Sequence, residues 1–276
     1  MLYRTILVYL NDRRRAERML EPAVLLARRY NAHLIGLHVY PSVMPPPIPS
    51  PASRYVAGTI LEFERAESDA IGAVFSAMTA NQPFVSEWRA VKAPLFEMPT
   101  VVMDHARTTD LIVAGQADPS WNFSLTMDFP ERLALESGRP VLVVPNASQH
   151  REFGRNALIA WKPTREAARA TFDALPLLED AEQVHILEVK QSADTPTIPD
   201  TSIAAALGRH GIKSILQNTV APDSRVGDEI LSRLAGENVD LLVMGTYGHS
   251  RVREYILGGA TRHIAQYMTV PTLWAH

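Results

Sequence analysis

The sequence predicts an α/β protein made of two copies of one unit, each built on a parallel sheet. Short apolar runs rich in Val, Ile and Leu alternate with stretches of helical spacing, which is typical of repeated β-α-β units. The pattern also repeats along the chain, because residues 5–40 match residues 156–190 in the order strand, turn, helix, strand. Two further pairs of segments match later in each copy: 108–116 with 238–246, and 137–145 with 268–276.

Within each copy the order β-α-β-α-β-α-β-α-β predicts five parallel strands buried on both faces. In the first copy the proline-rich stretch 41–53 predicts a surface loop, and a long helix is expected over Arg54 to Asn81. The polar, unpatterned stretch 146–154 is typical of a linker. We therefore expect two domains, at residues 1–147 and 153–276.

Composition and charge argue against several classes of function without excluding them. The chain has 276 residues, 46% hydrophobic and 21% charged, which is globular composition. A formal net charge of -3 gives no reason to expect nucleic acid or an anionic membrane as a partner. It contains no cysteine, which suits a reducing compartment. No apolar run is long enough to span a bilayer, and the basic cluster near the start follows its short apolar run instead of preceding it. We expect a soluble, cytoplasmic protein.

Glycines after the fourth strand of the second copy predict a phosphate site. Gly245 and Gly248 follow the apolar run 241–244, and Gly258 and Gly259 open the last expected helix. Ligands bind at the carboxyl ends of parallel strands, and bare backbone lets an anion approach the unpaired N–H groups of a helix N-terminus. Glycines in such places also serve tight turns and close helix packing. The spacing is neither that of a Walker loop nor G-x-G-x-x-G.

The spacing Gly245-x2-Gly248-x9-Gly258, followed by a helix and the closing strand "VPTLWAH", resembles the ATP-binding signature of the universal stress protein family. Both copies resemble that domain over nearly their whole length. The resemblance implies two tandem flavodoxin-like (Rossmann-like) domains, and ATP as a ligand of the C-terminal one, with a role for Mg²⁺ left open. The nucleotide-binding residues it implies are Gly245, Gly248, Arg251, Gly258, Gly259, Ala260, Thr261, Lys162 and Val189.

The second copy departs from the ATP-binding pattern at two places. A Ser or Thr follows the final glycine in ATP-binding members, but this chain has Gly259 there, and the nearest hydroxyl is that of Thr261. Those members also have an Asp at the end of the first strand, where this chain has Lys162. Lysine cannot accept hydrogen bonds from a ribose, although it could pair with phosphate. Arg251 and its neighbour Arg253 either close over phosphates or form a solvated pair.

The first copy departs further, and we expect it to have lost the nucleotide site. Gly115 is the part of the glycine loop that remains, Asn11 takes the place of the Asp, and Asp118 and Asp128 add negative charge where phosphate would sit. The run 13–15 is all arginine at the start of the first helix, where positive charge opposes the helix dipole. This run either holds an anion or forms a solvated face.

The sequence predicts neither a metal site nor a catalytic group. His249, His263 and His276 lack the i, i+4 spacing of a zinc-binding helix. The spacing of the other residues predicts neither a catalytic triad nor a carboxylate pair. If the protein has any enzymatic activity, we expect no more than slow ATP hydrolysis. Two functions stay open. One is a stress-response regulatory protein that binds ATP or a related adenine nucleotide. The other is a stress-response interaction module without nucleotide, its glycine loop retained for the fold.

Each copy ends in a short apolar strand, over Val141–Val144 and Pro271–Trp274. Both strands would leave unpaired edges if the copies folded apart. We therefore expect the copies to pack against each other about a pseudo-twofold axis, as the dimers of the family do. The result would be an intramolecular pseudo-dimer, which could form a homodimer in turn.

Overall fold

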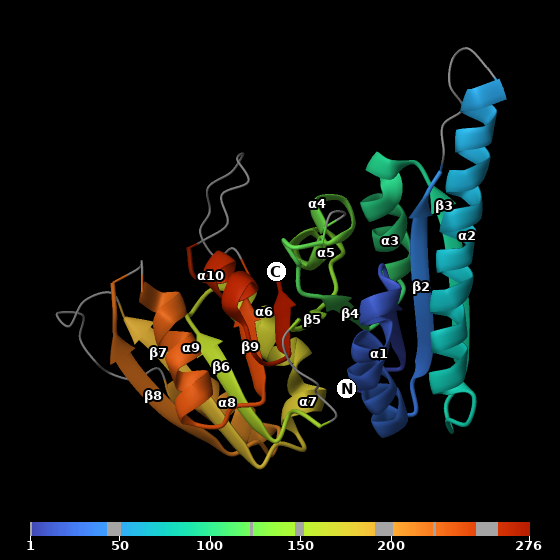
Figure 1. Ribbon diagram of the computed structural model, residues 1–276. Coiled ribbons are helices and arrows are strands. Elements are labelled where there is room, and N and C mark those ends of the chain that lie inside the picture. The colour runs from blue at the N-terminus through green and yellow to red at the C-terminus, as the bar shows by residue number, and fades with distance from the viewer. Residues whose placement is uncertain are drawn as a thin grey trace.

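The computed structural model describes residues 2–42, 51–121, 124–146, 152–190, 201–222, 225–246 and 259–276. These residues form a ten-stranded sheet with helices on both faces (Figure 1). The strand order is β3-β2-β1-β4-β5-β10-β9-β6-β7-β8, so the first five strands of the chain make one half of the sheet and the last five make the other. Among the described helices, none is both long and apolar enough to cross a membrane.

The first half of the sheet has the strand order β3-β2-β1-β4-β5, with all its strands parallel. Its elements are β1 (Thr5–Tyr9), α1 (Arg13–Tyr30), β2 (His33–Pro41), α2 (Pro51–Thr79), β3 (Ser86–Ala93), the 3-10 turn η1 (Leu95–Glu97), α3 (Met98–Ala106), β4 (Leu111–Gly115), α4 (Ser124–Met127), α5 (Pro130–Glu136) and β5 (Val141–Val144).

The second half repeats this order as β8-β7-β6-β9-β10, again parallel throughout. Its elements are β6 (Asn156–Trp161), α6 (Arg165–Asp173), α7 (Leu175–Leu178), β7 (Gln183–Lys190), α8 (Thr201–Arg209), β8 (Ser214–Val220), α9 (Val226–Gly236), β9 (Leu241–Gly245), α10 (Gly259–Tyr267) and β10 (Thr272–Ala275). The predicted fold class, two α/β units with five parallel strands each, is confirmed.

The two halves join through strands β5 and β10, which pair antiparallel. The register places Leu142 opposite Leu273 and Val141 opposite Trp274. All four side chains are fully buried, so the joint lies inside the core. The two terminal segments that the sequence predicted to meet therefore pair directly and close both of their free edges.

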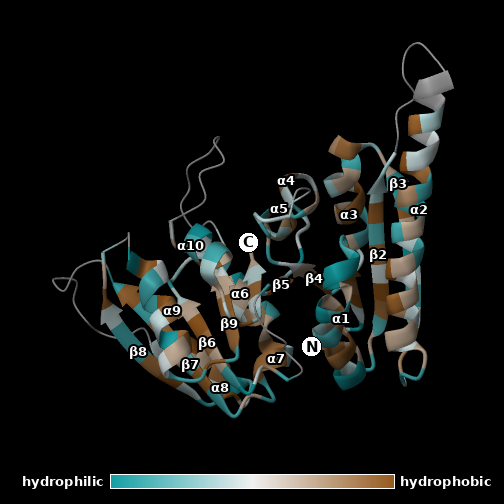
Figure 2. Cartoon of the chain, in the orientation of Figure 1, coloured by the Kyte–Doolittle hydropathy of each residue, from teal (hydrophilic) through white to brown (hydrophobic). Residues whose placement is uncertain are grey.

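Each face of the sheet carries one apolar cluster that runs through both halves. Because side chains alternate along a strand, Ile6 and Val8 face α1 and α2, whereas Leu7 and Tyr9 face the side of α3 and α5. The second half divides in the same way, with α6, α7 and α8 on the first face and α9 and α10 on the second. Figure 2 shows hydrophobic residues along the central strands and a mixture of hydrophobic and hydrophilic residues along the helices.

Hydrogen bonds also cross between the halves. The Tyr3 hydroxyl donates to the main-chain carbonyl of Asp173 at 2.6 Å, and the Tyr30 hydroxyl donates to that of Pro176 at 2.7 Å. On the other face, the Gln116 side-chain amide donates to a carbonyl in the last turn of α10 at 2.9 Å. The halves thus share polar contacts as well as a strand pair.

The proline-rich stretch behaves differently from the prediction at both its ends. Pro41 still belongs to β2, and α2 begins at Pro51 instead of Arg54 and ends at Thr79 instead of Asn81. Proline is tolerated at the first position of a helix, where its missing N–H would have no partner. Residues 43–50, between these ends, lie outside the described ranges, as do residues 147–151 of the expected linker.

Candidate functional site

The strand register identifies equivalent positions in the two halves. Gly115 ends β4 and Gly245 ends β9, and each of these strands pairs with the first strand of its half. The aligned pairs are Val8 with Val113 and Ile159 with Val243. Asn11 and Lys162 each lie three residues beyond an aligned residue of the first strand, so they occupy matching places at the carboxyl edge of the sheet.

In the second half this edge is lined by the turn that leads into α6. Lys162 is exposed there, and Thr164 caps α6 by accepting a hydrogen bond from the N–H of Ala167 at 3.4 Å. Glu166 is buried and forms an ion pair with Arg165 at 3.2 Å. Burial alone would raise the pKa of Glu166, but hydrogen bonds from the backbone and Thr164, together with nearby positive charge, hold it below its ordinary value.

Gly245 is required by packing against α6. A Cβ at this position would lie 2.5 Å from both the nitrogen of Ala167 and the carbonyl carbon of Glu166, which are backbone atoms that cannot move aside. Close helix packing, one of the roles expected for these glycines, therefore accounts for Gly245. Gly259 differs, because a Cβ there would meet nothing within 4 Å. Nothing in the described chain requires a glycine at the start of α10.

The other residues implied by the resemblance are placed in part. Val189 lies near the end of β7, beside the edge that carries Lys162, and is half-buried. Thr261 is buried in the first turn of α10, and Ala260 before it is half-buried. The remaining predicted residues, Gly248, Arg251 and Gly258, lie outside the described ranges, as do His249 and Arg253.

His276 and His263 have structural partners. The Nδ1 atom of His276 lies 2.9 Å from the carbonyl of Thr246, so it carries the proton, and its Nε2 accepts from Arg165 at 3.1 Å. His263 pairs with Asp228 at 2.8 Å and links α10 to α9. Within the described ranges, no group of three or more His, Cys, Asp or Glu residues is arranged to hold a metal ion.

The first half fills its matching edge with a buried ion pair. Arg15 and Asp128 lie 2.7 Å apart, with 5% and 0% of their side chains exposed. The negative charge that the sequence predicted at Asp128 is thus present but neutralised within the chain. Arg14 pairs with Asp12 at 2.6 Å and is largely exposed. The expectation of a solvated arginine face is wrong for Arg15, whose guanidinium holds an anion of this same chain.

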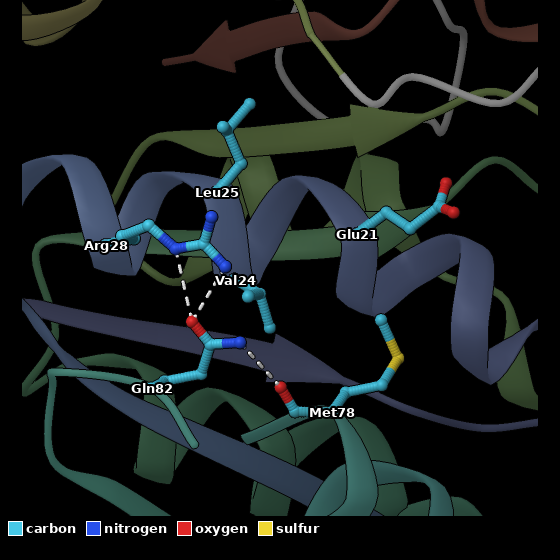
Figure 3. A pocket seen from close by; sticks show the side chains of 6 residues that line it. All are labelled: Glu21, Val24, Leu25, Arg28, Met78 and Gln82. Carbon is cyan, nitrogen blue, oxygen red and sulfur yellow. Dashed lines mark hydrogen bonds between the residues drawn. The ribbon is translucent and has the colours of Figure 1, made fainter. Parts of the chain in front are cut away.

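A separate hollow of about 330 Å³ lies between α1 and α2 (Figure 3). The residues that line it are Glu21, Val24, Leu25, Arg28, Met78 and Gln82. Arg28 donates two hydrogen bonds to the side-chain oxygen of Gln82, at 2.8 and 3.1 Å. Because α1 runs back from the carboxyl edge, its second half lies toward the opposite ends of the strands. The hollow is therefore distinct from the edge that carries Lys162.

Comparison with known proteins agrees with this architecture. Residues 155–276 match the model of the universal stress protein family. A universal stress protein from Archaeoglobus fulgidus is similar in structure, with a TM-score of 0.71 and 16% identity over 98% of this chain and 95% of that one. A putative universal stress protein from Pseudomonas aeruginosa gives a TM-score of 0.61 and 14% identity, over 99% and 93%. A search of the curated proteins finds no match.

The fold defines an α/β protein with two Rossmann-like halves. A further protein from Pseudomonas aeruginosa, described as functionally unknown, has a similar structure, with a TM-score of 0.58 and 14% identity over 99% of this chain and 92% of that one. The match to the universal stress protein family covers residues 155–276, in the second half of the chain. For the first half, the comparison rests on these similar structures. Because they are at most 16% identical in sequence, they show a shared fold.

Sequence reasoning missed two residues at the carboxyl edge. Arg15 was grouped with two exposed neighbours, and Glu166 was not singled out. Both lie in the first turn of the helix that follows the first strand of their half, and both are buried. The helical spacing places Arg15 on the inner side, because it lies four positions before Met19, which is a core residue.

Proposed function

We propose that this protein is a stress-response regulatory protein that binds ATP or a related adenine nucleotide in its C-terminal domain, residues 153–276. The observation that carries the proposal is the start of α10, at Gly259 and Thr261. A Cβ added to Gly259 would meet no atom of the described chain within 4 Å, and Thr261 supplies a hydroxyl in the same turn. A helix N-terminus with unpaired N–H groups favours a phosphate group. The family match over residues 155–276 supports the assignment.

In this proposal the backbone at Gly245, Gly248, Gly258 and Gly259 lets the phosphates approach closely. Lys162, exposed at the end of β6, pairs with the phosphate chain. The remaining assigned residues are Arg251, which also pairs with phosphate, Ala260 and Thr261 at the start of α10, and Val189 beside the nucleoside. No residue is given a catalytic role.

A second function, an interaction module without nucleotide, is favoured by two observations. Gly245 is needed for packing against α6 whether or not a ligand binds, so the glycine spacing has a partial explanation in the fold. Lys162 also favours the interaction module, because a lysine cation stands where a ribose would need a hydrogen-bond acceptor.

The two functions are separated by a matched pair of glycine variants. Gly259→Val places a bulky side chain at the N-terminus of α10, and Gly208→Val does the same on the exposed surface of α8, where a Cβ also meets nothing within 4 Å. Titration calorimetry with ATP should give saturable binding to the unaltered protein and to Gly208→Val, with loss in Gly259→Val. Absence of saturable binding of ATP, ADP and AMP to the unaltered protein at millimolar concentration would favour the interaction module.

A further inference from the structure

The carboxylate of Asp128 accepts five hydrogen bonds from four different residues. Its Oδ1 accepts from Arg15 Nη2 at 2.7 Å and from the amide of Asn11 at 2.8 Å. Its Oδ2 accepts from Arg15 Nη1 at 3.1 Å, from the hydroxyl of Ser124 at 2.9 Å and from the backbone N–H of Asp118 at 3.0 Å. Each oxygen of a carboxylate can accept about two hydrogen bonds, so this group is fully satisfied.

The surroundings exclude water from the group. The side chain of Asp128 is 0% exposed, and that of Arg15 is 5% exposed. The Arg15 guanidinium also lies over the ring of Trp121, with 5.3 Å between its central carbon and the ring centroid. Two charges taken out of water are stable only when their geometry and hydrogen bonding are good. Such a setting selects for an anion with two oxygens that matches the fork of the guanidinium.

Three of the four donor residues lie at the carboxyl edge of the sheet. Asn11 follows β1, Asp118 follows β4, and Arg15 lies in the first turn of α1. These are the segments from which an open α/β sheet makes a ligand site. The fourth donor, Ser124 of α4, and Asp128, ten residues beyond Asp118, lie further along the connection from β4 to α5, which brings the carboxylate back onto these donors.

We propose that the first half holds a site for a small carboxylate, and that Asp128 is its resident, covalently tethered ligand. The donors on Asn11, Arg15, Asp118 and Ser124 form the receptor. The tethered carboxylate fills it permanently and thereby prevents the first half from taking an external anion. This inference is independent of nucleotide binding in the second half.

The test is rescue by a free carboxylate. Asp128→Ala removes the carboxylate and leaves a space the size of a formate ion. Thermal unfolding is measured in sodium formate and in sodium chloride at the same concentration. In formate at ten times its dissociation constant, the midpoint of Asp128→Ala should be about 3–5 °C higher than in chloride. The unaltered protein, whose site is occupied, should show the same midpoint in both salts.

Two variants separate a site from a general effect of salt. Asp128→Asn removes the charge but keeps the volume, so formate has no room and should leave the midpoint unchanged. The double variant Arg15→Met with Asp128→Ala has the room without the receptor, and formate should again have no effect. An Asp128→Ala protein that is unfolded in chloride and folds in formate also supports the proposal. Equal midpoints in the two salts, or an unfolded protein in both, overturn it.

Discussion

The two halves place opposite charges at the same point of the same scaffold. Arg15 in the first half and Glu166 in the second each lie four residues beyond the equivalent pair Asn11 and Lys162, and both are buried at the start of a helix. In the first half the cation holds an anion of the chain itself. In the second half the buried group is the anion, and the cation Lys162 is exposed. The two halves thus share a backbone arrangement, whereas the polar groups at the strand ends differ.

The same comparison shows what a glycine after a parallel strand can mean. A Cβ on Gly115 would lie 2.7 Å from the Arg15 guanidinium, whereas a Cβ on Gly245 would strike the backbone of α6 at 2.5 Å. At both positions a neighbouring group of the same chain leaves no room for a side chain. A glycine at the end of a parallel strand therefore does not by itself indicate a ligand.

The comparison is tested most strongly by removing the buried anion. Asp128→Ala leaves the Arg15 guanidinium buried without its partner, which should lower the free energy of unfolding by about 3–5 kcal/mol. The control is Glu136→Ala, which breaks the half-exposed Arg132–Glu136 pair on α5 and should cost less than about 0.5 kcal/mol. Urea denaturation measures both. Similar losses in the two variants would contradict the role given to the buried pair.

The two glycines of the second half should respond differently to the same substitution. Gly245→Ala forces the backbone of α6 to shift and should lower the free energy of unfolding by about 1–3 kcal/mol. Gly259→Ala meets open space and should change it by less than about 0.5 kcal/mol. Thermal denaturation of the two variants measures both changes in stability. An equal loss of stability in both variants would show that Gly259 is also closely packed.

Lys162 should make nucleotide binding depend on phosphate. Loss of a charge-assisted contact in Lys162→Ala should weaken ATP binding about tenfold, with little change for adenosine, because a cation attracts the phosphates but accepts nothing from a ribose. ATP should bind more tightly than AMP, and the affinity should fall with added salt. Calorimetry at two salt concentrations measures this. An affinity that is the same for ATP and adenosine would remove Lys162 from the site.

The smallest effect concerns acid stability in the second half. The pKa of Glu166 is lowered in the folded protein, so the folded state favours the charged form. Its contribution to stability is present above the ordinary pKa of a glutamate and is lost as the pH falls through the lowered value. Glu166→Gln should therefore destabilise the protein at pH 7 and flatten the decline of stability in acid. A decline as steep as that of the unaltered protein would assign the acid sensitivity to other groups.

The fold was readable from the sequence because its signals are local. Apolar runs and helical spacing gave the alternation of elements, and two terminal runs, 141–144 and 271–274, predicted the joint between the halves. The start of α2 was misplaced because a cluster of prolines signals a loop even where Pro51 begins a helix. The partner of Arg15 was not readable, because Asp128 lies 113 residues further along the chain and only the folded sheet brings them together.

Of the candidate site, the sequence predicted which strand ends would meet, and the register of the sheet places Asn11 and Lys162 at equivalent points as expected. It did not separate a glycine needed for packing from one in open space, because that difference depends on how closely α6 approaches β9. The nucleotide and the residues proposed to bind it stay predictions.

The antiparallel pair of β5 and β10 also affects how the protein can associate. A pairing within one chain does not weaken on dilution, because its effective concentration is fixed by the connection between the partners. The two edges that separate copies would use to find each other are therefore already occupied at every protein concentration. The outer edges of the ten-stranded sheet are β3 and β8. Of the described strands, these two are the ones whose edges are left for a homodimer, and the central joint would be the same in monomer and dimer.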